Sequence, residues 1–261
     1  MAKHCQRVKV HTVRSVRGRG PVFYASTPCA AEIASGSGDK HRLVSILLGR
    51  LVAVGSPLWK PCPSSNRPPF PVQVVHGLLG RPRLLLGECR GPALSFSEGG
   101  GKVWAAICGD DSDIGIDVAE ADEFQSHYPS HRVFHPQELQ HALMVAGGDL
   151  GNASALLWSI KEAAVKALGC AFHLVDPQQI TVYPSVGEAG RYLFPVGLSR
   201  QAMARLPPAA GRSLWVRSLP QGTMWLSIAI VNSHIDEAMG GSGIVMQVPY
   251  KGKMESHDQR S

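Results

Sequence analysis

The sequence lacks the closely spaced cysteines and histidines by which zinc sites are recognised. Its 261 residues include six cysteines, and no two of them form a CxxC pair. Eleven histidines are scattered as well, without an HxH or HExxH motif. These absences argue against a zinc site, and unclustered cysteines are typical of a protein from a reducing compartment. Cys108 and Cys170 lie in apolar stretches, so we expect both in the core.

Two further absences narrow the function. The chain has no GxxxxGKS/T motif and no GxGxxG between a strand and a helix, so nucleotide hydrolysis and dinucleotide binding lack support. No run approaches the roughly 20 apolar residues that cross a bilayer, and no apolar signal region stands at the start. With 44% hydrophobic residues and a mean hydropathy of -0.02, we expect a cytoplasmic protein with a substantial core and no membrane partner.

Acidic residues are missing from residues 1–20, which hold six Lys and Arg residues. The other 20 basic residues balance the 20 acidic ones, so this segment accounts for the net charge of +6. We expect residues 1–38 to be a basic, disordered tail. It could also bind nucleic acid or an acidic partner, or be an organelle-targeting segment. The neutral body lacks interleaved aromatic and basic residues, so we do not expect a nucleic-acid partner.

The segment from residue 158 to 166 predicts a helix with a polar edge. At 100° per residue, five side chains fall within an arc of about 140°. They are Trp158, Lys161, Glu162, Val165 and Lys166. The opposite side carries Leu156, Leu157, Ile160, Ala163, Ala164, Ala167 and Leu168. The apolar side can therefore be buried while the Lys/Glu/Lys edge faces a cleft, although Glu162 and Lys166 also fit an ordinary exposed i,i+4 pair.

Asp117 adds a second carboxylate. It lies at the end of a predicted strand over 114–118, and Trp158 follows it by 41 residues. Two carboxylates can hold Mg²⁺ through hard oxygen ligands, and neighbouring ammonium groups can neutralise phosphates. The combination suits a magnesium-bound diphosphate.

These two segments resemble the signature of the 4'-phosphopantetheinyl transferase superfamily. Gly115-Ile-Asp117 is similar to its Gly-Ile/Val-Asp segment, and Trp158-Ser-Ile-Lys-Glu-Ala-Ala-Val-Lys166 to its Trp/Phe-Ser-x-Lys-Glu segment. Between them, Arg132-Val-Phe-His-Pro-Gln-Glu138 is similar to the family's Phe-x-x-x-Glu helix start. Upstream, Gly80-Arg-Pro82 and Leu94-Ser-Phe-Ser-Glu98 resemble segments of the larger, surfactin-type members. The resemblance runs from about residue 39 to 231 and is strongest over 80–170.

The resemblance implies transfer of the 4'-phosphopantetheine group of coenzyme A to a serine of an acyl or peptidyl carrier protein. Adenosine 3',5'-bisphosphate is the expected by-product. The implied Mg²⁺ ligands are Asp117 and Glu162. The implied catalytic residues are Glu162, which would take the serine proton, Lys166 and Asp117. The implied coenzyme A contacts are Lys161, Lys166, Ser97 and Arg81. Trp158 would either line the cleft or simply pack.

The sequence departs from the family pattern at two positions. Glu98 stands where the family has a His that helps to hold the 3'-phosphate of coenzyme A, and a carboxylate would repel that phosphate. Ala119 stands where surfactin-type members have a further acid, and the next acid is Glu120. A catalytically impaired homologue that binds coenzyme A or a carrier protein is therefore an alternative. A basic binding module acting through residues 1–20 is another.

We expect an α+β fold of two similar α+β halves packed face to face, in a monomer. The expected organisation is a tail over 1–38, an abbreviated first half over 39–110, a second half with the metal site over 111–235, and a disordered tail over 236–261. Expected helices cover 40–54, about 136–146, and a segment from a cap at Asn152 or Ser154 to Gly169. Expected strands cover 93–97, 102–108, 114–118, 179–183, 213–217 and 224–231. Residues 98–101 form either a hairpin turn or a phosphate-binding loop.

Overall fold

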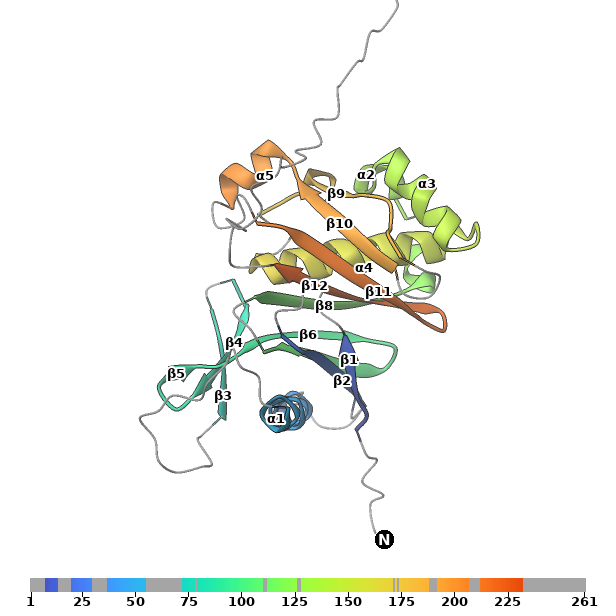
Figure 1. Ribbon diagram of the computed structural model, residues 1–261. Coiled ribbons are helices and arrows are strands. Elements are labelled where there is room, and N and C mark those ends of the chain that lie inside the picture. Colours follow the sequence, from blue (N-terminus) through green and yellow to red (C-terminus); the bar gives the residue numbers. More distant parts are fainter. Residues whose placement is uncertain are drawn as a thin grey trace, which may run out of the picture.

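The computed structural model shows two α+β units whose sheets are stacked face to face (Figure 1). It describes residues 8–13, 20–29, 37–54, 72–77, 79–109, 112–125, 128–170, 172, 174–187, 192–206 and 212–231. Helices cover the outer face of each sheet, so four layers follow one another across the molecule. Among the described helices, none is long and apolar enough to cross a membrane.

The first unit is built on a four-stranded antiparallel sheet with strand order β1-β2-β7-β6. Its strands are β1 (Val10–Val13), β2 (Val22–Pro28), β6 (Ala93–Gly99) and β7 (Lys102–Cys108). Helix α1 (Ser37–Ala53) lies against its outer face (Figure 1). A small sheet beside it consists of β3 (Val72–His76), β4 (Pro82–Leu86) and β5 (Cys89–Arg90).

The second unit has a five-stranded antiparallel sheet with strand order β8-β12-β11-β10-β9. Its strands are β8 (Asp113–Glu120), β9 (Ile180–Val182), β10 (Tyr192–Leu198), β11 (Leu214–Gln221) and β12 (Met224–Val231). The long helix α4 (Leu150–Leu168) crosses its outer face. The shorter helices are η1 (Ala121–Phe124), α2 (Ser130–Val133), α3 (Pro136–Val145), η2 (Pro177–Gln179) and α5 (Arg200–Arg205).

Both units use the same order of elements. In the first, β2 leads to α1, and the β6–β7 hairpin returns with β7 beside β2. In the second, β8 leads to α4, and the β11–β12 hairpin returns with β12 beside β8. The predicted α+β fold of two similar halves packed face to face is therefore confirmed.

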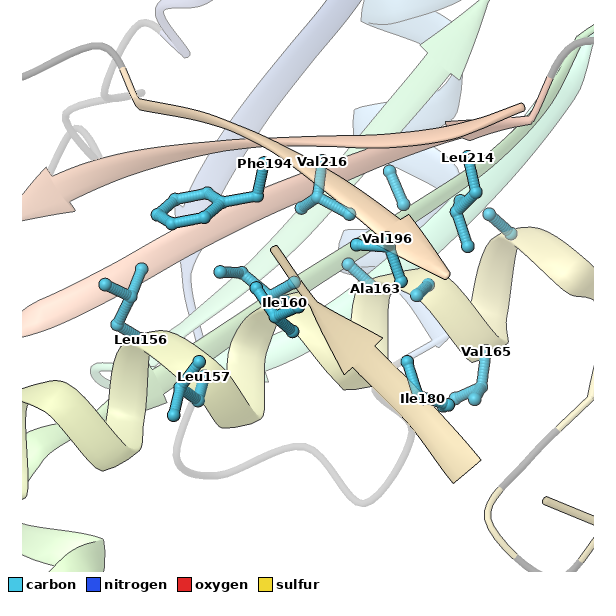
Figure 2. Packing of buried hydrophobic residues seen from close by; sticks show 14 of the residues in the cluster. Leu156, Leu157, Ile160, Ala163, Val165, Ile180, Phe194, Val196, Leu214 and Val216 are labelled. Atoms are coloured by element: carbon cyan, nitrogen blue, oxygen red, sulfur yellow. The ribbon is translucent and has the colours of Figure 1, made fainter. Parts of the chain in front are cut away.

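Three apolar clusters hold the layers together. One fills the space between α1 and its sheet, and a second joins the inner faces of the two sheets. The third lies between α4 and the outer face of the second sheet (Figure 2). There Ile160 and Ala163 of α4 face Phe194, Val196 and Val216 from the strands. This packing buries the predicted apolar side of α4 and fixes which side of the helix remains for function.

The local signals around α4 and the β6–β7 hairpin agree well with the structure. Gly100 and Gly101 have φ values of 60° and 64°, which a two-residue hairpin turn requires. Helix α3 begins at Pro136, and α4 ends at Gly169 with a φ of 74°. The α4 cap was predicted wrongly, because Asp149 accepts a hydrogen bond from the Asn152 backbone N at 2.6 Å. Helix α4 thus starts earlier than expected.

The structure corrects the extent of the first unit. Strands β1 and β2 lie within the segment expected to be a basic tail, and β2 is central in its sheet. The basic, glycine-rich residues before it hid the apolar Val22–Ala25 stretch, which pairs with β7 and is buried between α1 and the second sheet. Strand β10 was also missed, because Pro195 and Gly197 weaken its strand signal. The expected tail over 236–261 lies outside the described residues.

Candidate active site

Asp117 and α4 come together at the seam between the two units. The carboxylate of Asp117, from β8, lies 2.6 Å from the Lys166 ammonium of α4. Ser97 of β6 donates to the same carboxylate, with its Oγ 2.9 Å from Asp117 Oδ1. Glu162 lies one turn before Lys166 on α4 and lines the same pocket, and the negative charge of Asp117 contributes to raising its pKa. The predicted trio of Asp117, Glu162 and Lys166 is thus assembled.

Gly115 allows α4 to approach β8 this closely. An added Cβ at Gly115 would lie 2.0 Å from the Ala163 carbonyl oxygen and 2.6 Å from the Ala167 backbone N. Both are backbone atoms of α4, so a side-chain rotation could not relieve the clash. The glycine of the Gly-Ile-Asp segment therefore sets the distance between the two elements that carry the acids.

We expect Gly115→Ala to damage both stability and site geometry. The helix would have to move outward by about 1 Å, because protein interiors are close-packed. Overpacking of this kind costs about 1–3 kcal/mol of unfolding free energy, and a displacement of about 1 Å can lower a catalytic rate about 10²-fold. Urea denaturation measures the first effect, and the catalytic rate of the site measures the second. Gly49→Ala in α1 is the control, because an added Cβ there meets nothing within 4 Å. If both variants behave alike, close approach at Gly115 is unimportant.

Burial raises the pKa of both acids above their ordinary values. For Asp117, desolvation is the largest cause, and the charge and hydrogen bond of Lys166, with the Ser97 hydrogen bond, oppose it. For Glu162, desolvation is again the largest cause, the negative charge of Asp117 adds to it, and Lys166 opposes it. Two partly desolvated carboxylates with one adjacent ammonium create a local demand for more positive charge. A bound cation would satisfy that demand.

A pocket of about 290 Å³ opens beside these residues. Glu162 and Lys166 of α4 line one wall, and the other walls come from the first unit, including α1, β6 and the segment before β4. The lining residues are Lys40, His76, Leu79, Gly80, Arg81, Pro82, Leu94, Ser95, Phe96, Glu162, Lys166, Gly169 and Cys170. The cleft predicted beside the Glu162 edge of the helix therefore belongs to both units.

Lys161 was predicted to face the cleft, but the structure shows it buried. Its side chain is 0% exposed, and its Nζ lies 2.5 Å from Glu138 Oε1 of α3. It also donates to the carbonyl oxygens of Val133 at 3.2 Å and Pro177 at 2.8 Å. An ammonium with these three acceptors, buried beneath α3 and η2, cannot reach a ligand in the pocket. We therefore assign Lys161 a structural role rather than contact with coenzyme A.

Arg81 lines the pocket, but its guanidinium is already paired. Its Nη2 lies 2.5 Å from Asp113 Oδ1 at the start of β8. Arg212 binds the other oxygen of the same carboxylate at 3.0 Å. Arg81 thus ties the first unit to β8.

Ser95 and Ser97 join the two units along β6 and β8. Ser95 Oγ accepts from the Ile116 backbone N at 3.1 Å, and Ser97 Oγ accepts from the Val118 backbone N at 3.2 Å. Ser97 is buried and does not line the pocket, whereas Ser95 does. Ser97 therefore lies on the side of Asp117 away from the pocket lining, where its hydrogen bond orients the carboxylate.

The structure shows the contacts of the residues at the two positions that depart from the family pattern. Glu98 forms an ion pair with Lys40, with Oε1 and Nζ 2.8 Å apart. Glu120 accepts a hydrogen bond from the Gly100 backbone N at 2.6 Å. Its carboxylate therefore binds the hairpin turn and does not act beside Asp117 as a further acid. Ala119 is buried in the cluster under α4. The Gly100 N–H is consequently engaged, which favours the turn interpretation of residues 98–101.

Trp158 packs and does not line the pocket. Its ring lies 5.0 Å from that of Phe172 and within 6.5 Å of those of Phe124 and Tyr128, measured between centroids. These aromatic residues join α4 to the segments around η1 and beyond the helix end. The packing interpretation of Trp158 therefore describes the structure.

Sequence reasoning did not name Lys40, His76 or Cys170 as residues of the site. Lys40 lies in the first turn of α1, and it was not predicted because only the tertiary structure places it across the pocket from α4. Cys170 directly follows the end of α4 and was expected only in the core; burial raises the pKa of its thiol to about 11. A thiol with such a pKa is a poor nucleophile at neutral pH.

Metal-binding capacity is limited to few protein ligands. Within the described part of the chain, no group of three or more His, Cys, Asp or Glu side chains is arranged to hold a metal. Asp117 and Glu162 offer two carboxylates of the hard type. Mg²⁺ usually takes one or two carboxylates and completes its shell with waters and substrate phosphates. The donor set fits Mg²⁺ bound together with a diphosphate.

A family model matches most of the second unit. Residues 113–198 match the model described as the 4'-phosphopantetheinyl transferase superfamily. No curated protein matches the chain significantly. Among solved structures, the ACPS–CoA complex of Chronobacterium ammoniagenes has 21% identity, a TM-score of 0.40, and covers 48% of this chain and 99% of its own. The apo-ACPS structure has 20% identity, a TM-score of 0.38, and corresponding coverages of 46% and 95%. The matched segment of the family model contains Asp117, Glu138, Glu162 and Lys166.

Proposed function

We propose that this protein transfers the 4'-phosphopantetheine group of coenzyme A to a serine of an acyl or peptidyl carrier protein, with Mg²⁺, and releases adenosine 3',5'-bisphosphate. One observation carries the proposal. Asp117 from β8 contacts Lys166 of α4, and Glu162 and Lys166 line a pocket between the two units, with all three residues inside the segment that matches the transferase family model. The arrangement supplies both signs of charge where a diphosphate would lie.

Asp117 and Glu162 are the residues that would hold Mg²⁺. When bound, the ion would neutralise charge on the diphosphate and on the leaving bisphosphate. Lys166 lies against Asp117 with a side chain 30% exposed, so its ammonium can turn toward a phosphate oxygen. Ser97 donates a hydrogen bond to the Asp117 carboxylate and so limits the rotation of that side chain. These contacts orient the acids before the substrate arrives.

The transfer step exchanges one phosphorus–oxygen bond for another. The serine hydroxyl oxygen of the carrier attacks the phosphorus next to the pantetheine, and the bond from that phosphorus to the bridging oxygen breaks. The bond electrons leave on adenosine 3',5'-bisphosphate, and Glu162 accepts the serine proton. Glu162 is the carboxylate of α4 that lines the pocket, so it is placed to accept that proton. Lys166 counters the charge that develops on the phosphate oxygens.

One chain can provide the complete site. The pocket takes its lining from α1, β6 and the segment before β4 in the first unit and from α4 in the second. A monomer therefore suffices for the proposed reaction. We place the reaction in the cytoplasm, where coenzyme A and apo-carrier proteins occur together.

Mass spectrometry of intact carrier proteins tests the proposal. Apo-carriers from fatty acid, polyketide and peptide synthesis are incubated separately with the protein, coenzyme A and Mg²⁺. We expect at least one carrier to gain the mass of a single phosphopantetheine group, and a chelator to prevent that gain. Binding of coenzyme A without transfer to any carrier would support the catalytically impaired homologue instead.

A further inference from the structure

Three guanidinium groups converge on the carboxylate of Asp113 at the start of β8. Arg81 Nη2 lies 2.5 Å from Asp113 Oδ1, and Arg90 Nη2 lies 3.8 Å from the same oxygen. Arg212 Nη2 lies 3.0 Å from Asp113 Oδ2. Arg81 and Arg90 belong to the first unit, whereas Arg212 precedes β11 in the second. One carboxylate cannot balance three guanidinium charges, so this cluster carries an excess of positive charge.

Of these four residues, Arg81 is the one that lines the pocket. Its side chain lies across the C-terminal end of α4, because a Cβ added at Gly169 would be 2.8 Å from Arg81 Nη1 and 3.1 Å from its Cδ. Gly169 also lines the pocket. The Arg81 guanidinium therefore lies at the pocket wall where the two units meet. Rotation about its side-chain bonds can turn it from Asp113 toward a ligand.

Asp113 can release Arg81 without becoming an uncompensated charge. The Asp113 side chain is 16% exposed, and Arg212, whose side chain is 14% exposed, binds its other oxygen. Arg90 is 76% exposed, so a small side-chain movement can bring it into direct contact with the oxygen that Arg81 leaves. A carboxylate that kept no partner at this depth would be costly. The second and third guanidinium groups remove that cost, so the Arg81–Asp113 pair is exchangeable.

We propose that Asp113 is an internal competitor of coenzyme A for Arg81. Its carboxylate occupies the guanidinium when the pocket is empty, and an anionic group of coenzyme A replaces it on binding, while Arg90 and Arg212 retain Asp113. This inference rests on the proposed function, because it concerns the same pocket and donor. Asp113 does not line the pocket. It therefore acts through Arg81 as a positioning residue and sets the affinity for the donor, not the rate of the transfer step.

The sign of the Asp113→Asn effect distinguishes competition from a structural link between the units. We expect coenzyme A to bind about three- to tenfold more tightly to Asp113→Asn, because a neutral amide holds Arg81 less strongly and no longer repels an anion. If Asp113 only joined the units, its loss would loosen the pocket wall and weaken binding. Titration calorimetry with coenzyme A and Mg²⁺, without carrier protein, measures the affinity.

Two single variants are the controls. Asp122→Asn makes the same charge change at an exposed residue of η1 outside the pocket lining and should keep the wild-type affinity. Asp113→Glu keeps the competing carboxylate and should bind coenzyme A no more tightly than the wild type. In the transfer assay, the gain in Asp113→Asn should appear in the KM for coenzyme A and leave kcat unchanged.

A double-mutant cycle tests whether Asp113 acts through Arg81. In an Arg81→Gln background, Asp113→Asn should change the affinity for coenzyme A by less than about twofold, because no guanidinium remains to be released. In an Arg90→Gln background, the tightening should persist, because Arg81 is still present. Circular dichroism of each variant shows that it is folded.

The outcomes separate this inference from the proposed function. Tighter binding of coenzyme A to Asp113→Asn supports the inference even if no carrier protein is modified. Weaker or unchanged binding to folded Asp113→Asn overturns it, and so does equal tightening with and without Arg81. If coenzyme A binds to neither the wild type nor Asp113→Asn, the inference is overturned together with the assignment of the donor.

Discussion

Asp117→Asn and Glu162→Gln are each expected to lower the rate of phosphopantetheine transfer by about 10²–10³-fold. Each change removes one carboxylate from a site that, among the described residues, offers few others to a cation, and loss of one preorganised electrostatic group commonly costs about 10²–10³ in rate. The amide replacements keep side-chain size. The amide oxygen introduced by Asp117→Asn would still accept hydrogen bonds from Ser97 and Lys166. The measurement is the initial rate of carrier modification by mass spectrometry, over a range of Mg²⁺ concentrations.

Two controls separate a catalytic loss from an unfolded protein. Burial raises the pKa of Asp117, which means that its charged form is costly in the folded state. Because the amide removes that charge and still accepts hydrogen bonds, Asp117→Asn should lower the unfolding free energy by no more than about 3 kcal/mol and leave the protein folded. Asp122→Asn makes the same chemical change at an exposed residue of η1 and should retain the wild-type rate. Wild-type rates in both Asp117→Asn and Glu162→Gln at ordinary Mg²⁺ would remove the metal assignment.

Glu138→Ala is expected to lower the unfolding free energy by about 3–5 kcal/mol, because it leaves a buried ammonium without its carboxylate. The Lys161 and Glu138 side chains are 0% and 1% exposed. Glu138 also accepts from the Val182 backbone N at 3.0 Å and from the His135 backbone N at 2.8 Å. Removal of the carboxylate thus leaves hydrogen-bond donors on α4, on β9 and at the start of α3 without their acceptor. Urea denaturation with circular dichroism detects the loss.

The pH dependence of the unfolding free energy of Glu138→Ala tests whether the Lys161 ammonium is the uncompensated charge. Burial lowers the pKa of Lys161 below its ordinary value of 10.5, and Glu138 opposes that shift. Without Glu138, the folded-state pKa falls further, so between that value and 10.5 the unfolded chain binds more protons than the folded one. The unfolding free energy of the variant then rises with pH across this window. The difference in unfolding free energy between the variant and the wild type therefore becomes smaller. A deficit that stays constant from about pH 7 to about pH 10 would contradict an uncompensated Lys161 ammonium.

The double variant Glu138→Leu, Lys161→Met completes this test. An apolar pair of similar volume removes the stranded charge, so the double variant should be more stable than Glu138→Ala. Recovery is expected to be partial, since the Val182 and His135 backbone N–H groups still lack their acceptor. A double variant less stable than Glu138→Ala would show that the charge is not the source of the cost.

Several elements were predictable because their signals are local. The turn at Gly100–Gly101, the start of α3 at Pro136 and the end of α4 at Gly169 follow from backbone preferences of single residues. The apolar side of α4 follows from its periodicity. The acids Asp117 and Glu162 could be paired because their two short segments together resemble one family signature. None of these inferences needed the position of a distant segment.

Strand β2 and the pocket were not predictable in this way. Strand β2 pairs with β7, about eighty residues later, and the residues that precede it are basic and glycine-rich. The pocket wall that carries Lys40 exists because α1 packs on a sheet whose neighbour unit contains α4. Composition within a short window contains no information about such partners.

The sequence by itself predicted the chemistry of the site: two carboxylates and an ammonium on a strand and a helix. Only the tertiary structure decided which helical residues face the ligand. Helical periodicity placed Lys161, Glu162 and Lys166 on one arc, but α3 and η2 cover the Lys161 side and present Glu138 to it. An ammonium of this kind lies where a carboxylate and carbonyl oxygens can replace its water, and those acceptors come from other parts of the chain.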